Sequence, residues 1–107
     1  MPDDQYMGFI DSVVGKIAQA PENGTVEIDA GVWQSYRTEV FQALAKRPDV
    51  TLKTTYKGAG GLMSFTIPAG ADVLGAVGRR TVVTFAELAA LLGVTPVEAG
   101  MKLEPRA

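Results

Sequence analysis

The stretch that decides the fold is Val50–Pro68, which reads VTLKTTYKGAGGLMSFTIP. Apolar side chains alternate with polar ones on both sides of a glycine-rich centre; the apolar set is Val50, Leu52, Tyr56, Met63, Phe65 and Ile67. A period of two places successive side chains on opposite faces of a strand. The centre, Gly58-Ala59-Gly60-Gly61, has the composition of a turn. The sequence therefore predicts a β-hairpin with one apolar face.

Upstream of the hairpin, the spacing predicts a helix and then a strand. Over residues 3–19 apolar side chains recur every three or four positions, as in an amphipathic helix, and Asp3 or Asp4 is placed to cap it. Over residues 25–30 apolar and polar side chains alternate. We expect that segment to be a half-buried strand.

A second helix is predicted between this strand and the hairpin. Its apolar stripe at helical spacing consists of Trp33, Tyr36, Val40, Phe41 and Leu44. Pro48 stops it, because the residue before a proline avoids the helical conformation. We expect a helix over residues 34–47, with Trp33 buried between it and the sheet. The alternative is that Trp33, Tyr36 and Phe41 line a ligand groove.

The last third of the chain predicts one clear helix. Segment 69–81 is rich in glycine, and Asp72 is placed to cap a short helical turn. Thr84 and Glu87 have the spacing of a capping box ahead of a leucine stripe, and Gly93 ends that helix.

The predicted order is helix, strand, helix, strand, strand, helix, which indicates an α+β fold with a small mixed sheet packed on helices. A helix joins strands 25–30 and 50–57, so a parallel crossover is available if they are neighbours. A chain of 107 residues suits one domain. Within it we expect an N-terminal helix and loop (1–24), a core module (25–93) and a loose tail (94–107).

Composition excludes several chemistries. The chain has no cysteine and no histidine, which removes disulfides, thiolate nucleophiles, zinc–thiolate sites and the commonest general base. Ser35 and Ser64 have no histidine to activate them. We therefore expect no enzymatic activity, no cofactor and no tightly bound transition metal.

Two further constellations have ordinary structural interpretations. Gly58-Ala59-Gly60-Gly61 lacks the Lys-Ser/Thr ending of a phosphate loop and lies between strands, so a turn is favoured. Glu27, Asp29 and Asp72 could together bind a divalent cation or form an acid/base pair. A polar strand face and a helix cap are the favoured interpretation.

Charge favours neither nucleic acid nor membrane. The formal net charge is -2, and no apolar run approaches the length of a membrane span. The alternative is a basic strip for nucleic acid, formed by Lys53, Lys57, Arg79 and Arg80 with Tyr56 for stacking. We expect a soluble chain without membrane insertion.

Several strings resemble a small uncharacterised α+β module of gut Firmicutes. They are Thr25–Asp29, Trp33, Ala43–Thr51, Thr55–Gly58 and Phe65–Asp72, within a match over about residues 25–93. In that family the module occurs in hypothetical and large surface-associated proteins, near immunoglobulin-like or leucine-rich repeats. After Asp72 this chain departs from the family pattern, because a Gly-Phe pair and aromatic residues are expected where it has Arg79, Arg80, Val82 and Val83.

Two functional hypotheses follow. The resemblance implies a noncatalytic protein-binding or scaffold module of a bacterial surface-associated protein, extracellular or at the cell surface. Small size and acidic balance indicate instead a cytoplasmic phage or mobile-element protein that inhibits a host protein by direct binding. In both cases the partner is another protein or a second copy.

We expect the contact to lie on the hairpin, because one of its strands is expected to form a sheet edge open to strand addition. The candidate contact residues are Lys53, Thr55, Lys57, Ser64 and Thr66. The alternative is that Lys53 and Lys57 protect that edge from pairing.

Overall fold

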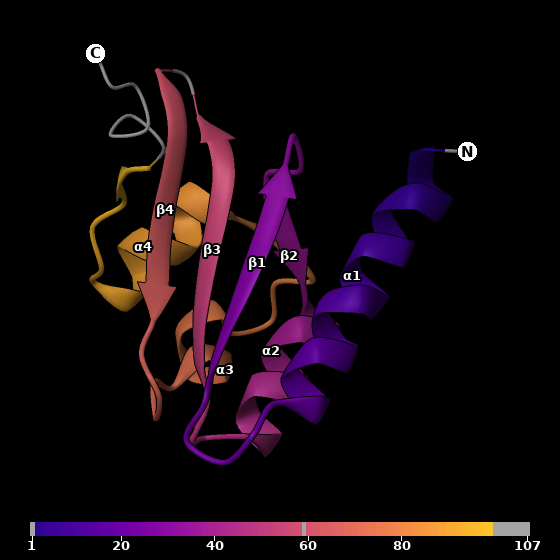
Figure 1. Ribbon diagram of the computed structural model, residues 1–107, viewed down its shortest axis with the longest axis vertical. Coiled ribbons are helices and arrows are strands. Elements are labelled where there is room, and N and C mark those ends of the chain that lie inside the picture. The colour runs from indigo at the N-terminus through magenta and orange to yellow at the C-terminus, as the bar shows by residue number, and fades with distance from the viewer. Residues whose placement is uncertain (1, 59, 100–107) are drawn as a thin grey trace.

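Four helices and six strands make up residues 2–58 and 60–99, the part of the chain that the computed structural model describes (Figure 1). In chain order they are α1 (Pro2–Gln19), β1 (Thr25–Gly31), β2 (Ser35–Arg37), α2 (Thr38–Lys46), β3 (Thr51–Gly58), β4 (Gly61–Ile67), α3 (Val73–Val77), β5 (Val82–Thr84), α4 (Phe85–Leu92) and β6 (Val97–Glu98). One sheet has the order β1-β3-β4-β6, and β2 and β5 form a second sheet. Helices α2, α3 and α4 lie behind the larger sheet, with α1 beside β1. The predicted α+β fold is confirmed, and α3, β2, β5 and β6 are additional elements.

The alternating stretch forms the predicted hairpin of β3 and β4. The two strands pair antiparallel, with Leu52 opposite Ile67 and Tyr56 opposite Met63. Because directly opposite side chains lie on the same face, the apolar set gathers on one side of the sheet. The hairpin is confirmed; Ala59 of its turn lies outside the described residues.

Strand β1 pairs with β3 in parallel, which confirms the expected crossover. Helix α1 begins at Pro2, so Asp3 and Asp4 lie in its first turn instead of preceding it. Proline suits the first helical position, because the backbone N–H it lacks would have no partner within the helix there. Strand β6 falls in the segment expected to be a loose tail, whose residues 100–107 lie outside the described part.

The second helix is shorter than predicted, because its first residues form a strand instead. Tyr36 lies in β2 opposite Val83 of β5. At both ends of this two-stranded ladder a helix begins: Thr38 N donates to Thr81 O at 2.9 Å, and Phe85 N donates to Gln34 O at 2.8 Å. The ladder thus provides backbone partners for the first N–H groups of α2 and α4.

Trp33 does not lie between α2 and the sheet, and that expectation was wrong. Gly31 has φ +59 and Trp33 N donates to Ala30 O at 3.0 Å, so the chain turns sharply after β1. The turn directs the half-buried indole onto α1, with ring centroids 5.3 Å from Tyr6 and 6.1 Å from Phe9.

Both predicted caps in the last third are confirmed. Gly75 N donates to Asp72 Oδ1 at 3.0 Å, and the capped segment continues to Val77 as α3. The hydroxyl of Thr84 accepts from Glu87 N at 3.1 Å, while the Glu87 carboxylate accepts from Thr84 N.

A hydrogen bond between two side chains lies in the middle of the core. Tyr36 Oη and Thr54 Oγ1 are 2.6 Å apart, and both residues have 0% exposure. Burial raises the pKa of Tyr36 far above its ordinary value. Tyr36 also packs edge-on against Phe85, at 4.8 Å between ring centroids. This pair therefore joins β2 to β3 through the core.

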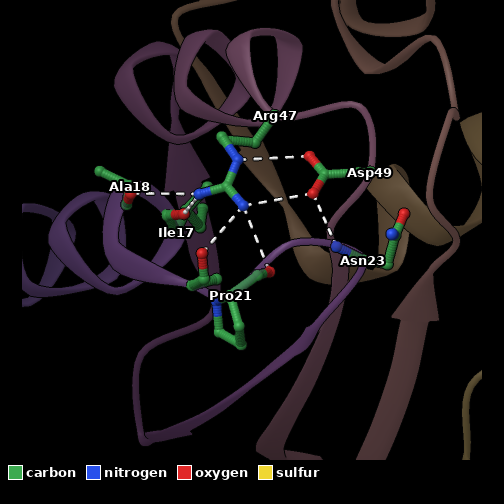
Figure 2. A network of polar contacts seen from close by, with 7 residues as sticks. Ile17, Ala18, Pro21, Asn23, Arg47 and Asp49 are labelled. Atoms are coloured by element: carbon green, nitrogen blue, oxygen red, sulfur yellow. Dashed lines mark hydrogen bonds and ion pairs between the residues drawn. The ribbon is translucent and has the colours of Figure 1, made fainter.

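A single guanidinium ties the end of α1 to the start of β3 (Figure 2). Arg47 donates to the carbonyl oxygens of Ile17, Ala18, Ala20 and Pro21 at 2.9–3.3 Å. It also forms two hydrogen bonds of 3.3 Å with the Asp49 carboxylate, which accepts from Asn23 N at 2.7 Å. These bonds satisfy carbonyls that the helix itself leaves unpaired.

We expect Asp49 to make stability depend on acid pH. Hydrogen bonds from Arg47 and then from Asn23 N lower the pKa of Asp49 from 3.8 to about 2. A carboxyl group whose pKa is lower in the folded than in the unfolded state stabilises the fold at any pH above its unfolded-state pKa. This stabilisation is lost as the pH falls through the folded-state pKa. Between pH 4 and 2 the free energy of unfolding should therefore fall less for Asp49→Asn than for wild type. Urea titrations at several pH values measure this, with Asp11→Asn on α1 as control; equal slopes would contradict the expectation.

Candidate functional site

In the part of the chain that the structure describes, one face of the four-stranded sheet carries no helix (Figure 1). We call it the open face, and its residues are Thr25, Glu27 and Asp29 of β1, Thr51, Lys53, Thr55 and Lys57 of β3, Leu62, Ser64 and Thr66 of β4, and Val97 of β6. The strand register fixes this set, because directly opposite residues lie on the same side. Most of these side chains are exposed, and Val97 reaches 58%.

All five candidate contact residues lie on the open face. Lys53 is opposite Thr66, and Thr55 is opposite Ser64, while Lys57 follows two positions along β3. The two lysines and Thr66 are exposed, Thr55 is half-buried, and Ser64 is 5% exposed. The five residues predicted on the hairpin are thus neighbours on one surface of the structure.

The five candidate residues share a face of the sheet, but only part of the hairpin lies at the edge of the sheet, as was expected for one of its strands. Strand β3 lies between β1 and β4, so Thr55 is inside the sheet. Strand β6 covers Met63 and Ser64 of β4, and Ala99 N donates to Leu62 O at 2.8 Å. In the described part of the chain, no strand pairs with the outer side of Phe65–Ile67. Within the described residues, only this short part of the hairpin is therefore open to strand addition.

Two acidic residues of the open face were absent from the predicted contact set. Glu27 is in register with Lys53, and Asp29 is in register with Thr55. The alternation of β1 placed both carboxylates on a polar face, but only the parallel pairing with β3 places them beside the lysines. The Asp29 carboxylate accepts from Gly31 N at 3.1 Å, which holds it near the end of β1.

The structure does not bring together the residue sets of the two alternative hypotheses. These sets are the three carboxylates Glu27, Asp29 and Asp72, and the basic strip of Lys53, Lys57, Arg79 and Arg80. Glu27 and Asp29 lie on the open face, whereas Asp72 caps α3, and within residues 2–58 and 60–99 no three carboxylates could hold a metal ion together. Arg80 contacts Glu87 of α4 at 3.8 Å, on the helix-covered side and apart from Lys53 and Lys57.

The hollow between α2 and α3 has both of its charged lining side chains already hydrogen-bonded. It has a volume of about 260 Å³, with Arg47 and Asp72 among its lining residues. Both side chains are engaged, Arg47 with the carbonyls after α1 and Asp72 with the N-terminus of α3. Tyr36 is fully buried and Trp33 packs on α1, so no aromatic ligand groove forms there.

Comparison with known proteins adds no relative. No protein-family model, curated protein or solved structure matches this chain. Among the helices described, none is long and apolar enough to cross a membrane.

Proposed function

We propose that this chain is a noncatalytic protein-binding or scaffold module whose contact surface is the open face. One observation carries the proposal: the five candidate contact residues lie together on the only face of the larger sheet that α2, α3 and α4 leave uncovered. We further propose a bacterial surface-associated protein as its setting, on the strength of the sequence resemblance.

The physical character of the face supports the proposal. Its side chains stand on paired strands, so their positions are fixed before a partner arrives and little backbone entropy is lost on binding. Hydroxyl groups of threonine and serine alternate with charged groups, and Leu62 and Val97 add apolar surface at one side. Such a mixture suits a partially polar protein interface.

A charge change on the open face tests the proposal. The variant Lys53→Glu with Thr66→Glu alters two neighbouring exposed positions, and Lys46→Glu with Gln42→Glu makes the same charge change on α2. Proteins captured by wild type should also be captured by the α2 variant and be lost with the open-face variant. Quantitative mass spectrometry measures the captured proteins, and circular dichroism checks folding.

Two results would contradict the proposal. One is an open-face variant that keeps the partners of wild type. The other is a wild type that captures no more protein than the open-face variant does.

A further inference from the structure

The open face carries two columns of opposite charge on neighbouring strands. Glu27 and Asp29 form an acidic column on β1, and Lys53 and Lys57 form a basic column on β3. Neighbouring strands are about 4.8 Å apart, so the columns run side by side. The pairing places Glu27 at the same height as Lys53.

Within residues 2–58 and 60–99, none of these four charged groups forms an ion pair. The ion pairs of the described residues are Arg37–Glu39, Arg47–Asp49 and Arg80–Glu87, all of them away from the open face. A partner surface of a single charge sign would be attracted by one column and repelled by the other. A well-matched partner must therefore present both columns, at strand spacing and in exchanged order.

A second copy of the chain meets this requirement. Rotation by half a turn about an axis parallel to the strands, midway between β1 and β3, keeps the strand direction and exchanges the two columns. Glu27 then faces Lys53 of the second copy, and Lys53 faces Glu27. On the same axis Asp29 faces the hydroxyl of Thr55, so two of the rows are complementary.

We propose, resting on the function proposed above, that the partner of the open face is a second copy stacked face to face about this axis. Sheets stack about 10 Å apart and about 30° from parallel. Glu27 and Lys53 lie at the middle of the paired strands, between Thr25 and Asp29. A rotation of one sheet relative to the other therefore shifts these two residues least from their counterparts in the second copy.

Other symmetric arrangements of the same face place like charges together. An axis across the strands lays β1 on β1 and β3 on β3, so Glu27 meets its own copy and so does Lys53. Edge-to-edge pairing of two β1 strands would set Glu27 and Asp29 beside their own copies, which is destabilising. Only the axis along the strands joins opposite charges.

The dimer is expected to be weak and sensitive to salt. The axis between β1 and β3 overlays only these two strands of each copy, so the contact between the sheets is smaller than the roughly 800 Å² per partner of a standard interface. Charged groups at such a surface are screened over about 10 Å at 0.1 M salt. Association should therefore be measured by sedimentation velocity up to about 1 mM protein, near the dissociation constant of weak complexes, and at both low and high salt.

A pair of opposite charge changes tests the proposal. Glu27→Lys places a basic residue at position 27 beside Lys53, so both columns are basic at this level. Lys53→Glu places an acidic residue beside Glu27, so both columns are acidic there. Each variant alone should self-associate at least about tenfold more weakly than wild type, since like charges meet. An equimolar mixture of the two should associate again, because opposite charges face each other in the heterodimer; this rescue also shows that both variants fold.

Matched controls lie on α2, at exposed positions behind the sheet. Gln42→Lys and Lys46→Glu change the charge there in either direction and should leave self-association as in wild type. A wild type that stays monomeric at low salt would overturn the dimer, as would a mixture without rescue. Loss of the dimer alone leaves the function proposed above in place if the captured proteins still depend on Lys53 and Thr66; if they do not, both proposals fail.

Discussion

Arg47→Ala is expected to lower the free energy of unfolding by about 2–4 kcal/mol, because each hydrogen bond to a charged group contributes about 1.5–3 kcal/mol and several are lost together. The Arg47 side chain is 22% exposed and donates to carbonyls at and just after the end of α1, of which those of Ala18 and Ala20 would lose this partner. Against a total stability of about 5–15 kcal/mol, that loss is large. Urea denaturation followed by circular dichroism measures it.

Two further variants distinguish the planar hydrogen-bonding geometry of the Arg47 guanidinium from its positive charge. Arg47→Lys keeps the charge but cannot bond the carbonyls of α1 and the Asp49 carboxylate in the same planar arrangement, so it should recover less than half of the loss. Lys46→Ala, one position earlier and exposed, should change stability by less than about 0.5 kcal/mol. A lysine variant as stable as wild type would show that charge alone matters.

Tyr36→Phe is expected to lower the free energy of unfolding by about 1–3 kcal/mol, because it leaves the buried Thr54 hydroxyl without its partner. The ring itself remains, so its packing against Phe85 is retained. The loss can thus be assigned to the hydrogen bond, and not to a cavity.

A double variant distinguishes the hydrogen bond from packing. Thr54→Val keeps the shape of the side chain, and Tyr36→Phe with Thr54→Val removes both polar groups together. Stability of the double variant should return to within about 1 kcal/mol of wild type, since no unsatisfied group is left. Losses that simply add in a thermal and urea double-mutant cycle would rule out the coupling.

The parts of the fold that follow a strict period were predictable from sequence. Alternation over residues 51–67 fixes which side chains share a face, and the structure has the same hairpin. The Thr84–Glu87 box likewise needs only local geometry. Both depend on neighbours along the chain, where period and capping chemistry decide the structure.

Elements that depend on distant partners were not predictable. Tyr36 fits a helical stripe with Val40 and Leu44, yet it lies in β2 because Val83 of β5 pairs with it. Strand β6 has two residues, too few for any period, and forms where β4 offers a free edge. Tertiary pairing overrides local propensity in both cases.

The candidate site was likewise predictable where it depends on local alternation, and not where it depends on pairing between distant strands. Alternation groups the side chains of Lys53, Thr55 and Lys57, and pairing across the hairpin adds Ser64 and Thr66. The acidic column on β1 joins them only through the strand order β1-β3-β4, which no short-range pattern contains.

The β2–β5 ladder is expected to close later in folding than the hairpin of β3 and β4. It joins the middle of the chain to its last third, so closing it fixes a long loop, whereas the hairpin of β3 and β4 closes a short one. Before closure, Thr38 N and Phe85 N lack their carbonyl partners; the first turn of α2 then has no side-chain cap, whereas α4 keeps its local Thr84–Glu87 capping box. We expect α2 to be completed only when this loop closes, and the closure of so long a loop to lower the folding rate.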